Sequence, residues 1–324
     1  MTAGPFIDCD NLDEAIDQYT KHLGYRLDML MPADEPREAI VSKNGEALRL
    51  MSVPPAVAGG STVRENHPAA EAAPLLRKEG SLEKPPKGGT QNSWITGRAG
   101  MEYRDLIPDR VGGKVIASHI RITKGGEVPD YVHYHKVRFQ MIYCKAGWVR
   151  VVYEDQGPPF VLNAGDCVLQ PPEIRHRVLE SSAGAEVLEV SAPAEHQTWV
   201  EHELELPTSE LKPDRIFDGQ RFVLHRGDSM ASDEACAITE TEIEEATQGY
   251  SSVRMVRLAA GAVYSPERFG EFVFLYVLSG NIQPQSSNLS FHTDEHVAFT
   301  HRTDSLGVTA FEDSEILEVR LREI

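Results

Sequence analysis

Apolar and polar residues alternate with a period of two along much of this 324-residue chain, which is the pattern of half-buried β-strands. The longest such run covers residues 115–123. Shorter runs at 140–143, 148–153, 161–162, 167–169, 177–179 and 186–190 follow it, with Gly and Pro between them. Many short strands with almost no helix predict a closed or nearly closed antiparallel barrel within residues 94–206.

Residues 207–324 repeat this strand pattern. Strands are expected there at 253–258, 272–278, 297–299 and 316–321, again punctuated by glycine. The repetition predicts a second barrel that packs against the first.

The first 52 residues have a different pattern. Asn11 and Glu14 form a plausible capping box, and Gly24 lies where a helix would end. Between them, apolar residues recur at helical spacing at Leu12, Ile16, Tyr19 and Leu23. Strands are expected on both sides of this helix, with a hairpin turn at Asn44-Gly45. We therefore expect a small α+β module of order β-α-β-β-β in residues 1–52, joined to the barrels by a Pro- and Gly-rich linker in residues 53–93.

Composition limits the classes of function. With 32 basic and 50 acidic residues, the formal charge is −18 at pH 7, which argues against binding to nucleic acid or to acidic membranes. No apolar run approaches the roughly 20 residues that span a bilayer, and the first residues lack the features of a signal peptide. Four scattered cysteines without a Cys-x-x-Cys pair suggest a reducing compartment. The expected location is the cytoplasm.

A metal site is indicated in the first barrel. His133 and His135 are two apart on a predicted strand, so their side chains share one face, about 7 Å apart along the chain. His176, far along the sequence and preceded by a Gly-Asp turn, would approach from another strand, and Gln140 from a third. Neutral imidazole is a common ligand for divalent transition metals. His-x-His alone is a weak signal, and this context strengthens it.

Two motifs in this region resemble those of the cupin family. The first consists of Gly126, His133, His135, Gln140 and Gly147, and the second of Gly165, Asp166, Pro171 and His176. The resemblance implies a double-stranded β-helix (jelly-roll) fold and a bicupin architecture. It also implies that His133, His135, Gln140 and His176 are the metal ligands. The second barrel has Tyr264-Ser265-Pro266 where the first has its histidine pair, so only one barrel is expected to hold metal.

Gln140 departs from the family pattern, which usually has Glu. A neutral amide leaves the charge of the metal uncompensated, which favours Lewis-acid, redox-neutral chemistry of the isomerase, cyclase or lyase type. The cofactor is then a divalent ion, Zn, Ni or Fe, and the substrate a small oxygen-rich molecule. If Gln140 is not a ligand, an Fe-dependent dioxygenase is the alternative. A closed metal shell would instead favour a non-catalytic binding or regulatory cupin.

Three polar side chains near these ligands are candidates for contacting substrate: Tyr131, Arg138 and Glu173. Arg138 could bind a substrate carboxylate through both edges of its guanidinium, but an ordinary ion pair with a nearby acidic residue is the favoured expectation for it. His119 is expected to face either the pocket or the surface.

The N-terminal segment from Asn11 to Arg26 resembles one module of the glyoxalase and vicinal-oxygen-chelate superfamily, whose members pair two such modules. Only one is present, and it lacks clear metal ligands. It must bury the exposed face of its sheet against the rest of the chain or against a second copy, so a structural or dimerising role is expected, with a homodimer as the expected assembly.

Overall fold

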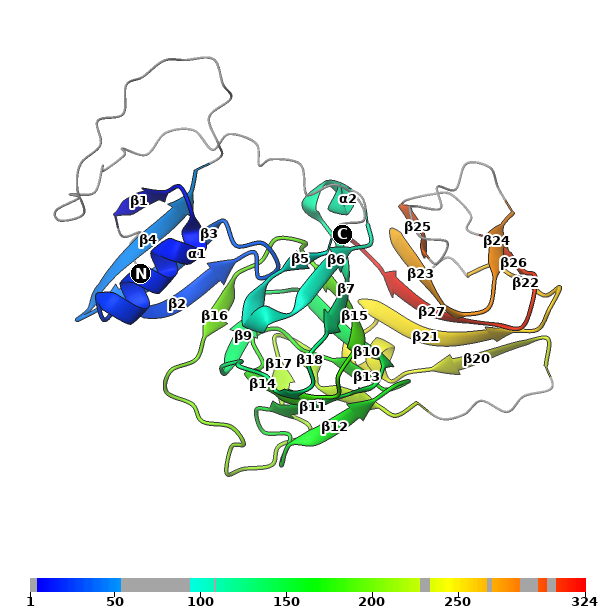
Figure 1. The fold of residues 1–324 in the computed structure, drawn as a ribbon. Helices are drawn as coiled ribbons and strands as arrows, with labels where there is room; N and C mark the ends of the chain where they lie inside the picture. The colour runs from blue at the N-terminus through cyan, green and yellow to red at the C-terminus, as the bar shows by residue number, and fades with distance from the viewer. Residues whose placement is uncertain are drawn as a thin grey trace, which may run out of the picture.

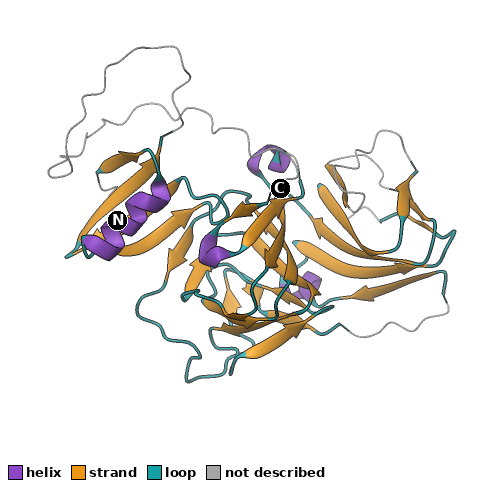
Figure 2. Ribbon diagram, viewed as in Figure 1, coloured by secondary structure: helices purple, strands orange, loops and turns teal. Residues whose placement is uncertain are grey.

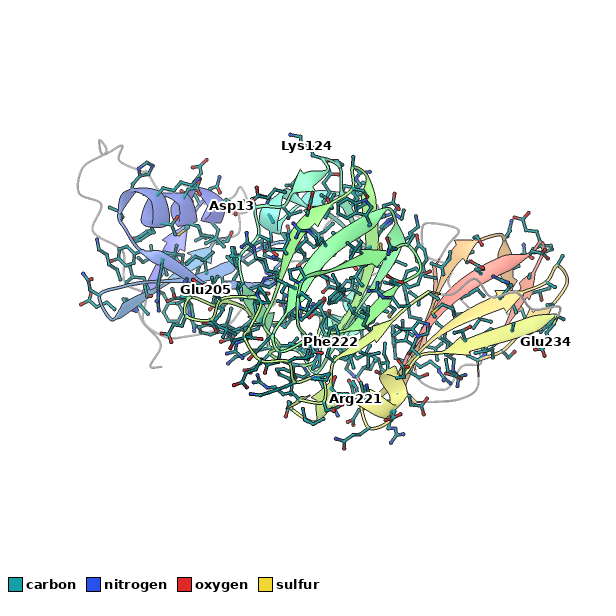
Figure 3. All side chains as sticks on the ribbon, turned by 90° about the horizontal axis from the view of Figure 1, so that it is seen from below. Asp13, Lys124, Glu205, Arg221, Phe222 and Glu234 are labelled. Atoms are coloured by element: carbon teal, nitrogen blue, oxygen red, sulfur yellow. The ribbon has the colours of Figure 1, made fainter. Side chains whose placement is uncertain are left out.

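The computed structural model describes residues 5–53, 94–107, 109–227, 234–266, 270–285, 297–301 and 307–324. Nearly all of the expected linker therefore lies outside the described residues. The fold is mainly β, as predicted, and its three units follow one another across the molecule (Figure 1). Figure 2 shows how little helix accompanies the strands. In Figure 3, Asp13 of the first unit and Glu234 of the last lie on opposite sides of the central barrel.

The N-terminal unit has the predicted order of elements. They are β1 (Phe6–Cys9), α1 (Leu12–Asp17), the π-helical turn η1 (Gln18–His22), β2 (Arg26–Met31), β3 (Glu38–Lys43) and β4 (Glu46–Ser52). Asn11 caps α1 by accepting the backbone N–H of Glu14 at 3.3 Å. Asn44 and Gly45 both have positive φ, at 53° and 85°, as a two-residue hairpin turn requires.

The central unit contains most of the short elements. They are β5 (Ile95–Thr96), η2 (Arg98–Gly100), β6 (Glu102–Asp105), α2 (Arg110–Gly113), β7 (Ile116–Ile122), β8 (Gly126–Glu127), β9 (His133–His135), β10 (Phe139–Ala146), β11 (Trp148–Tyr153), β12 (Phe160–Asn163), β13 (Cys167–Leu169), β14 (His176–Ser181), β15 (Ala185–Ala192), β16 (Thr198–Val200), β17 (Ile216–Phe217), β18 (Gln220–Arg221) and β19 (Val223–His225).

Two sheets form the walls of this barrel. One has the order β19-β13-β10-β15-β7-β6-β5, and the other contains β16-β9-β14-β11-β12. Apolar side chains such as Cys144, Val151 and Leu162 pack between them. Gly147, which closes the first motif, joins β10 to β11 with φ +69°, and a Cβ there would lie 2.2 Å from the Ser182 hydroxyl oxygen. Only glycine fits this turn.

The sheet of the N-terminal unit continues into the barrel. Strand β16 lies between β2 and β9, with Thr198 opposite both Leu30 and His135. One edge of the module's sheet is thus paired with the rest of the chain, whereas burial of the sheet face, which the sequence led us to expect, remains a prediction. The module's resemblance to the glyoxalase superfamily and the homodimer remain predictions.

The C-terminal unit forms the second barrel. Its elements are β20 (Cys236–Glu240), α3 (Ile243–Ala246), β21 (Ser251–Leu258), β22 (Val263–Tyr264), β23 (Phe272–Ser279), β24 (Ile282–Pro284), β25 (Val297–His301), β26 (Val308–Ala310) and β27 (Ser314–Leu321). The five-stranded sheet β20-β21-β27-β23-β25 accompanies the three-stranded sheet β22-β26-β24. A buried cluster that includes Leu275, Ile282 and Val308 belongs to this unit.

The two barrels share a hydrophobic core. Phe139 and Met141 of β10 belong to the same buried cluster as Phe274 of β23 and Val319 of β27. The central sheet also extends past the boundary expected at residue 206, because β19 pairs with β13. None of the helices in the described residues is long and apolar enough to cross a membrane.

Candidate metal centre

Three histidines converge on one point in the central barrel, as the strand spacing predicted. Strands β9 and β14 are antiparallel neighbours, and His176 lies directly opposite His133. His135 is on the same face of β9, two residues further on. The nitrogen atoms that His133, His135 and His176 offer lie within 4.8 Å of one another, and all three side chains are buried. Among the described residues, this is the one group of histidine, cysteine or acidic side chains placed to hold a metal ion.

The Nδ1 atom of each ring is anchored by the protein. Nδ1 of His133 donates to the backbone oxygen of Tyr131 at 2.8 Å, and Nδ1 of His176 donates to that of Ile174 at 2.9 Å. For His135, Nδ1 lies 2.9 Å from the hydroxyl oxygen of Thr198. A proton on Nδ1 leaves the lone pair on Nε2, which is the usual arrangement for metal-binding histidines.

The Nε2 atom of His133 is itself evidence for a ligand. It is buried and has no hydrogen-bond partner among the described residues. A buried polar atom without a partner costs about 1–3 kcal/mol, and a metal ion would satisfy this one. The residues present therefore fit a divalent ion bound by three imidazoles.

Burial also keeps the rings neutral. It lowers the pKa of His176 to about 4 and places the pKa values of His133 and His135 well below their ordinary range. The nearby positive charge of Arg98 lowers the pKa of His133 further. Neutral imidazoles have a free lone pair at neutral pH, as metal binding requires.

Gln140 of β10 is buried and lines the same cavity as His135 and His176. Its amide nitrogen donates to a carboxylate oxygen of Glu189 at 2.8 Å, and that oxygen also accepts the hydroxyl of Ser191 at 2.9 Å. The nitrogen end of the amide is thus engaged with β15. Gln140 as a fourth ligand remains a prediction.

A cavity of about 70 Å³ opens beside the histidines. Nine aliphatic side chains and two tyrosines line it: Met101, Ile120, Ile122, Ile142, Val149, Val151, Leu162, Val178, Val187, Tyr103 and Tyr153. The polar residues of its lining are Arg98, His135, Gln140, Gln170, His176 and Glu189. The cavity is therefore largely apolar, with His135 and His176 of the three-histidine group in its wall.

Sequence reasoning missed four polar groups at this site. Arg98 and Glu189 line the cavity, and the amide nitrogen of Gln170 lies 2.9 Å from Nε2 of His176. His196 is buried beside His135, with ring centroids 5.3 Å apart. Gln170 could have been noticed, since it lies between the Gly-Asp turn and His176. No local pattern distinguishes Arg98, Glu189 or His196 from surface residues.

The three expected substrate-contacting residues are not among the residues that line the cavity. Arg138 is more than half exposed; it forms an ion pair with Glu323 and its guanidinium lies over the Tyr250 ring. Glu173 is exposed in a left-handed turn with φ 60°. Both residues are exposed, whereas the three histidines are buried.

Tyr131 and His119 lie closer to the site. The Tyr131 ring centroid is 5.9 Å from that of His133, and its backbone oxygen holds the His133 ring. His119 is buried on the opposite face of β7 from the cavity-lining Ile120, where its Nε2 lies 2.9 Å from Glu186. Of the two orientations expected for His119, it has neither, since it is neither in the pocket nor at the surface.

Comparison with known proteins agrees with this geometry. Residues 118–191 match the family model described as a cupin domain. This part of the chain is therefore similar to a cupin domain. It includes both strands that carry the three histidines. No curated protein matches the chain.

The solved structures similar to this chain include a dioxygenase and a decarboxylase. A mutant salicylate 1,2-dioxygenase from Pseudoaminobacter salicylatoxidans, in complex with gentisate, is 11% identical with a TM-score of 0.50, covering 69% of this chain and 75% of that one. Oxalate decarboxylase from Bacillus subtilis is 16% identical with a TM-score of 0.43, covering 69% and 72%. At these identities the likeness concerns the fold alone.

Proposed function

We propose that this protein is a metal-dependent cupin enzyme that transforms a small organic molecule in the cavity of the central barrel. One observation carries the proposal. His135 and His176 belong both to the three-histidine group and to the cavity wall. Catalytic metal sites keep positions open to substrate, whereas structural sites are closed. A metal bound by three imidazoles at the wall of a cavity is of the first kind, which disfavours the non-catalytic alternative.

The chemistry that best fits the polar residues is redox-neutral. A divalent ion such as Zn or Ni, held by the three imidazoles, would supply Lewis-acid polarisation of a substrate oxygen. Glu189 is the carboxylate in the cavity lining, and we assign it the role of proton acceptor. Gln140 and Ser191 both donate to the same Glu189 oxygen, so they fix the orientation of the carboxylate.

The apolar lining refines the substrate expected from the sequence. Drug-sized ligands occupy pockets of roughly 300–1,000 Å³, far larger than the cavity of about 70 Å³ found here. A substrate with one polar end at the metal and a small apolar body fits better than one that is oxygen-rich throughout.

An iron-dependent dioxygenase is the second candidate. The three-histidine group favours it, because three histidines alone leave adjacent positions for O₂ and substrate. The salicylate 1,2-dioxygenase named above has the same kind of fold. Both candidates require the same three ligands and differ in the metal and in the use of oxygen.

Metal analysis of protein purified without added metal, followed by oxygen-uptake assays on small organic acids, separates the two candidates. Zinc or nickel without oxygen uptake supports the redox-neutral reaction, and iron with oxygen uptake supports the dioxygenase. We expect His133→Ala to abolish metal binding, while the matched variant at an exposed histidine, His22→Ala, retains it. Equal metal content in both variants would refute the three-histidine site.

The role of Glu189 needs its own variant. Glu189→Gln keeps the shape of the side chain and removes the base. We expect it to retain metal and lose turnover by roughly 100-fold or more, in the range usual for a general base. Full activity in Glu189→Gln would exclude Glu189 as the proton acceptor and leave the metal site unaffected.

A further inference from the structure

Arg98 brings a positive charge into the cavity from outside the matched cupin segment. It belongs to the short helical turn η2, and its side chain is only 9% exposed. We propose that Arg98 binds a carboxylate of the substrate, and that the substrate is a small monocarboxylic acid with an apolar body. This inference rests on the proposed function and adds the substrate class to it.

The partner of Arg98 leaves part of the guanidinium free to bind a ligand. Nη1 of Arg98 pairs with Oδ1 of the fully buried Asp130, whose Oδ2 accepts the backbone N–H of Val178 at 3.0 Å. Nε of Arg98 is buried without a hydrogen-bond partner among the described residues. A guanidinium offers five N–H donors in a planar fork, so it can hold Asp130 on one edge and a second carboxylate on another.

Charge balance points to an anionic ligand. With a divalent ion bound by three neutral imidazoles, the ion and Arg98 bring three positive charges to this region. The carboxylates of Asp130 and Glu189 bring two negative ones. One positive charge remains in a buried, weakly polarisable region, where uncompensated charge is unfavourable. A monocarboxylate neutralises it, whereas a neutral substrate does not.

The other residues that line the cavity determine which kind of substrate body can carry the carboxylate. Apart from its six polar residues, the cavity is walled by aliphatic side chains and two tyrosines, within about 70 Å³. A sugar acid or a dicarboxylate would bring further polar groups against these apolar walls without partners. A short aliphatic or other compact apolar body would bring no unpaired polar group against these walls.

A structural role is the competing explanation, in which Arg98 serves only as the counter-ion of Asp130. Asp130 lies 3.7 Å from Nδ1 of His133, so the ion pair also neighbours a metal ligand. In that case, replacement of Arg98 would weaken metal binding or folding without altering the choice between charged and neutral ligands. The preference for a carboxylate over the matching amide is therefore the measurement that separates the two roles.

The test uses the zinc-loaded full chain with butanoate and butanamide as probes, titrated by calorimetry. The wild type should bind butanoate at least about tenfold more tightly than butanamide, as expected for a charge-assisted contact. Arg98→Met combined with Asp130→Asn removes both buried charges together, so neither is left unpaired. This double variant should keep zinc and lose the preference, whereas Arg150→Met, at an ion pair with Glu180 outside the cavity lining, should keep both.

Two results would overturn the assignment. One is a wild type that binds zinc but shows no preference for butanoate. The other is a double variant that keeps zinc and the full preference, which would mean that the metal alone recognises the carboxylate. Failure of the wild type to bind zinc or any other divalent metal would instead count against the proposed function, so the two failures are distinguishable.

Discussion

Thr198 connects the N-terminal unit to the metal site, and its replacement by Val tests that connection. Thr198 is 1% exposed on β16, the strand that joins β2 to β9. Its hydroxyl oxygen lies 2.9 Å from Nδ1 of His135. Val has nearly the same shape, so Thr198→Val removes this contact while it leaves the strand pairing with Leu30 and His135 in place.

The expected effect follows from the buried position of the contact. Without the hydroxyl, Nδ1 of His135 has lost its partner in a buried place, which costs about 1–3 kcal/mol. The metal-free protein loses the same contact, so only the share of this cost that is specific to the metal-bound ring, which can no longer turn to another partner, lowers the metal affinity. Loss of a partner that orients a metal-binding histidine typically costs about 10–100-fold in affinity, and we expect a fall in this range.

Competition with a chromogenic chelator measures this change in zinc affinity directly. Thr309→Val, on β26 of the second barrel, is the matched control and should leave the affinity unchanged. If Thr198→Val bound zinc as tightly as the wild type, Thr198 would not orient His135, and the coupling between the N-terminal unit and the site would be refuted. Urea unfolding of both metal-free variants separates a loss of affinity from a loss of fold.

Three further predictions concern single side chains. Gln140→Glu places a second carboxylate about 2.8 Å from that of Glu189. The metal-free variant should therefore become less stable as the pH rises above about 5, and its affinity for zinc should increase. Equal stability of the metal-free variant at pH 5 and pH 8 would contradict this prediction. Arg98 and other partners hold the pKa of Asp130 at about 2, below its ordinary value of 3.8. The ionised carboxylate therefore contributes about 2 kcal/mol to the free energy of unfolding above pH 4, and this contribution is lost as the pH falls towards 2. In chemical unfolding curves, Asp130→Asn should not show this loss of stability. Burial raises the pKa of Cys144 to about 12, so mass spectrometry should find it unmodified by iodoacetamide at pH 8 in the folded protein and modified in urea.

Much of the secondary structure, and the shared face of His133 and His135 in the candidate metal site, could be predicted because they depend on local patterns. The period of two marks the strands, and it places His133 and His135 on one face whatever the surrounding fold. The hairpin at Asn44-Gly45 and the cap at Asn11 follow from backbone preferences of a few residues. The Gly-Asp turn before His176 indicated that a third imidazole would join the first two.

The residues that surround the ligands depended on the tertiary structure. Arg98 lies well before the first histidine in the chain, and Glu189 belongs to β15, which is in the other sheet from β9 and β14, so only the packing of the two sheets brings them into one cavity. Arg138, whose position beside the ligand strand suggested a substrate contact, turns instead towards Glu323 of the C-terminal unit. The sequence by itself determined where strands form and which side chains share a face, because these are properties of neighbouring residues. Which strands lie side by side, and so which charges reach the metal site, is a property of contacts between distant residues that no local pattern encodes.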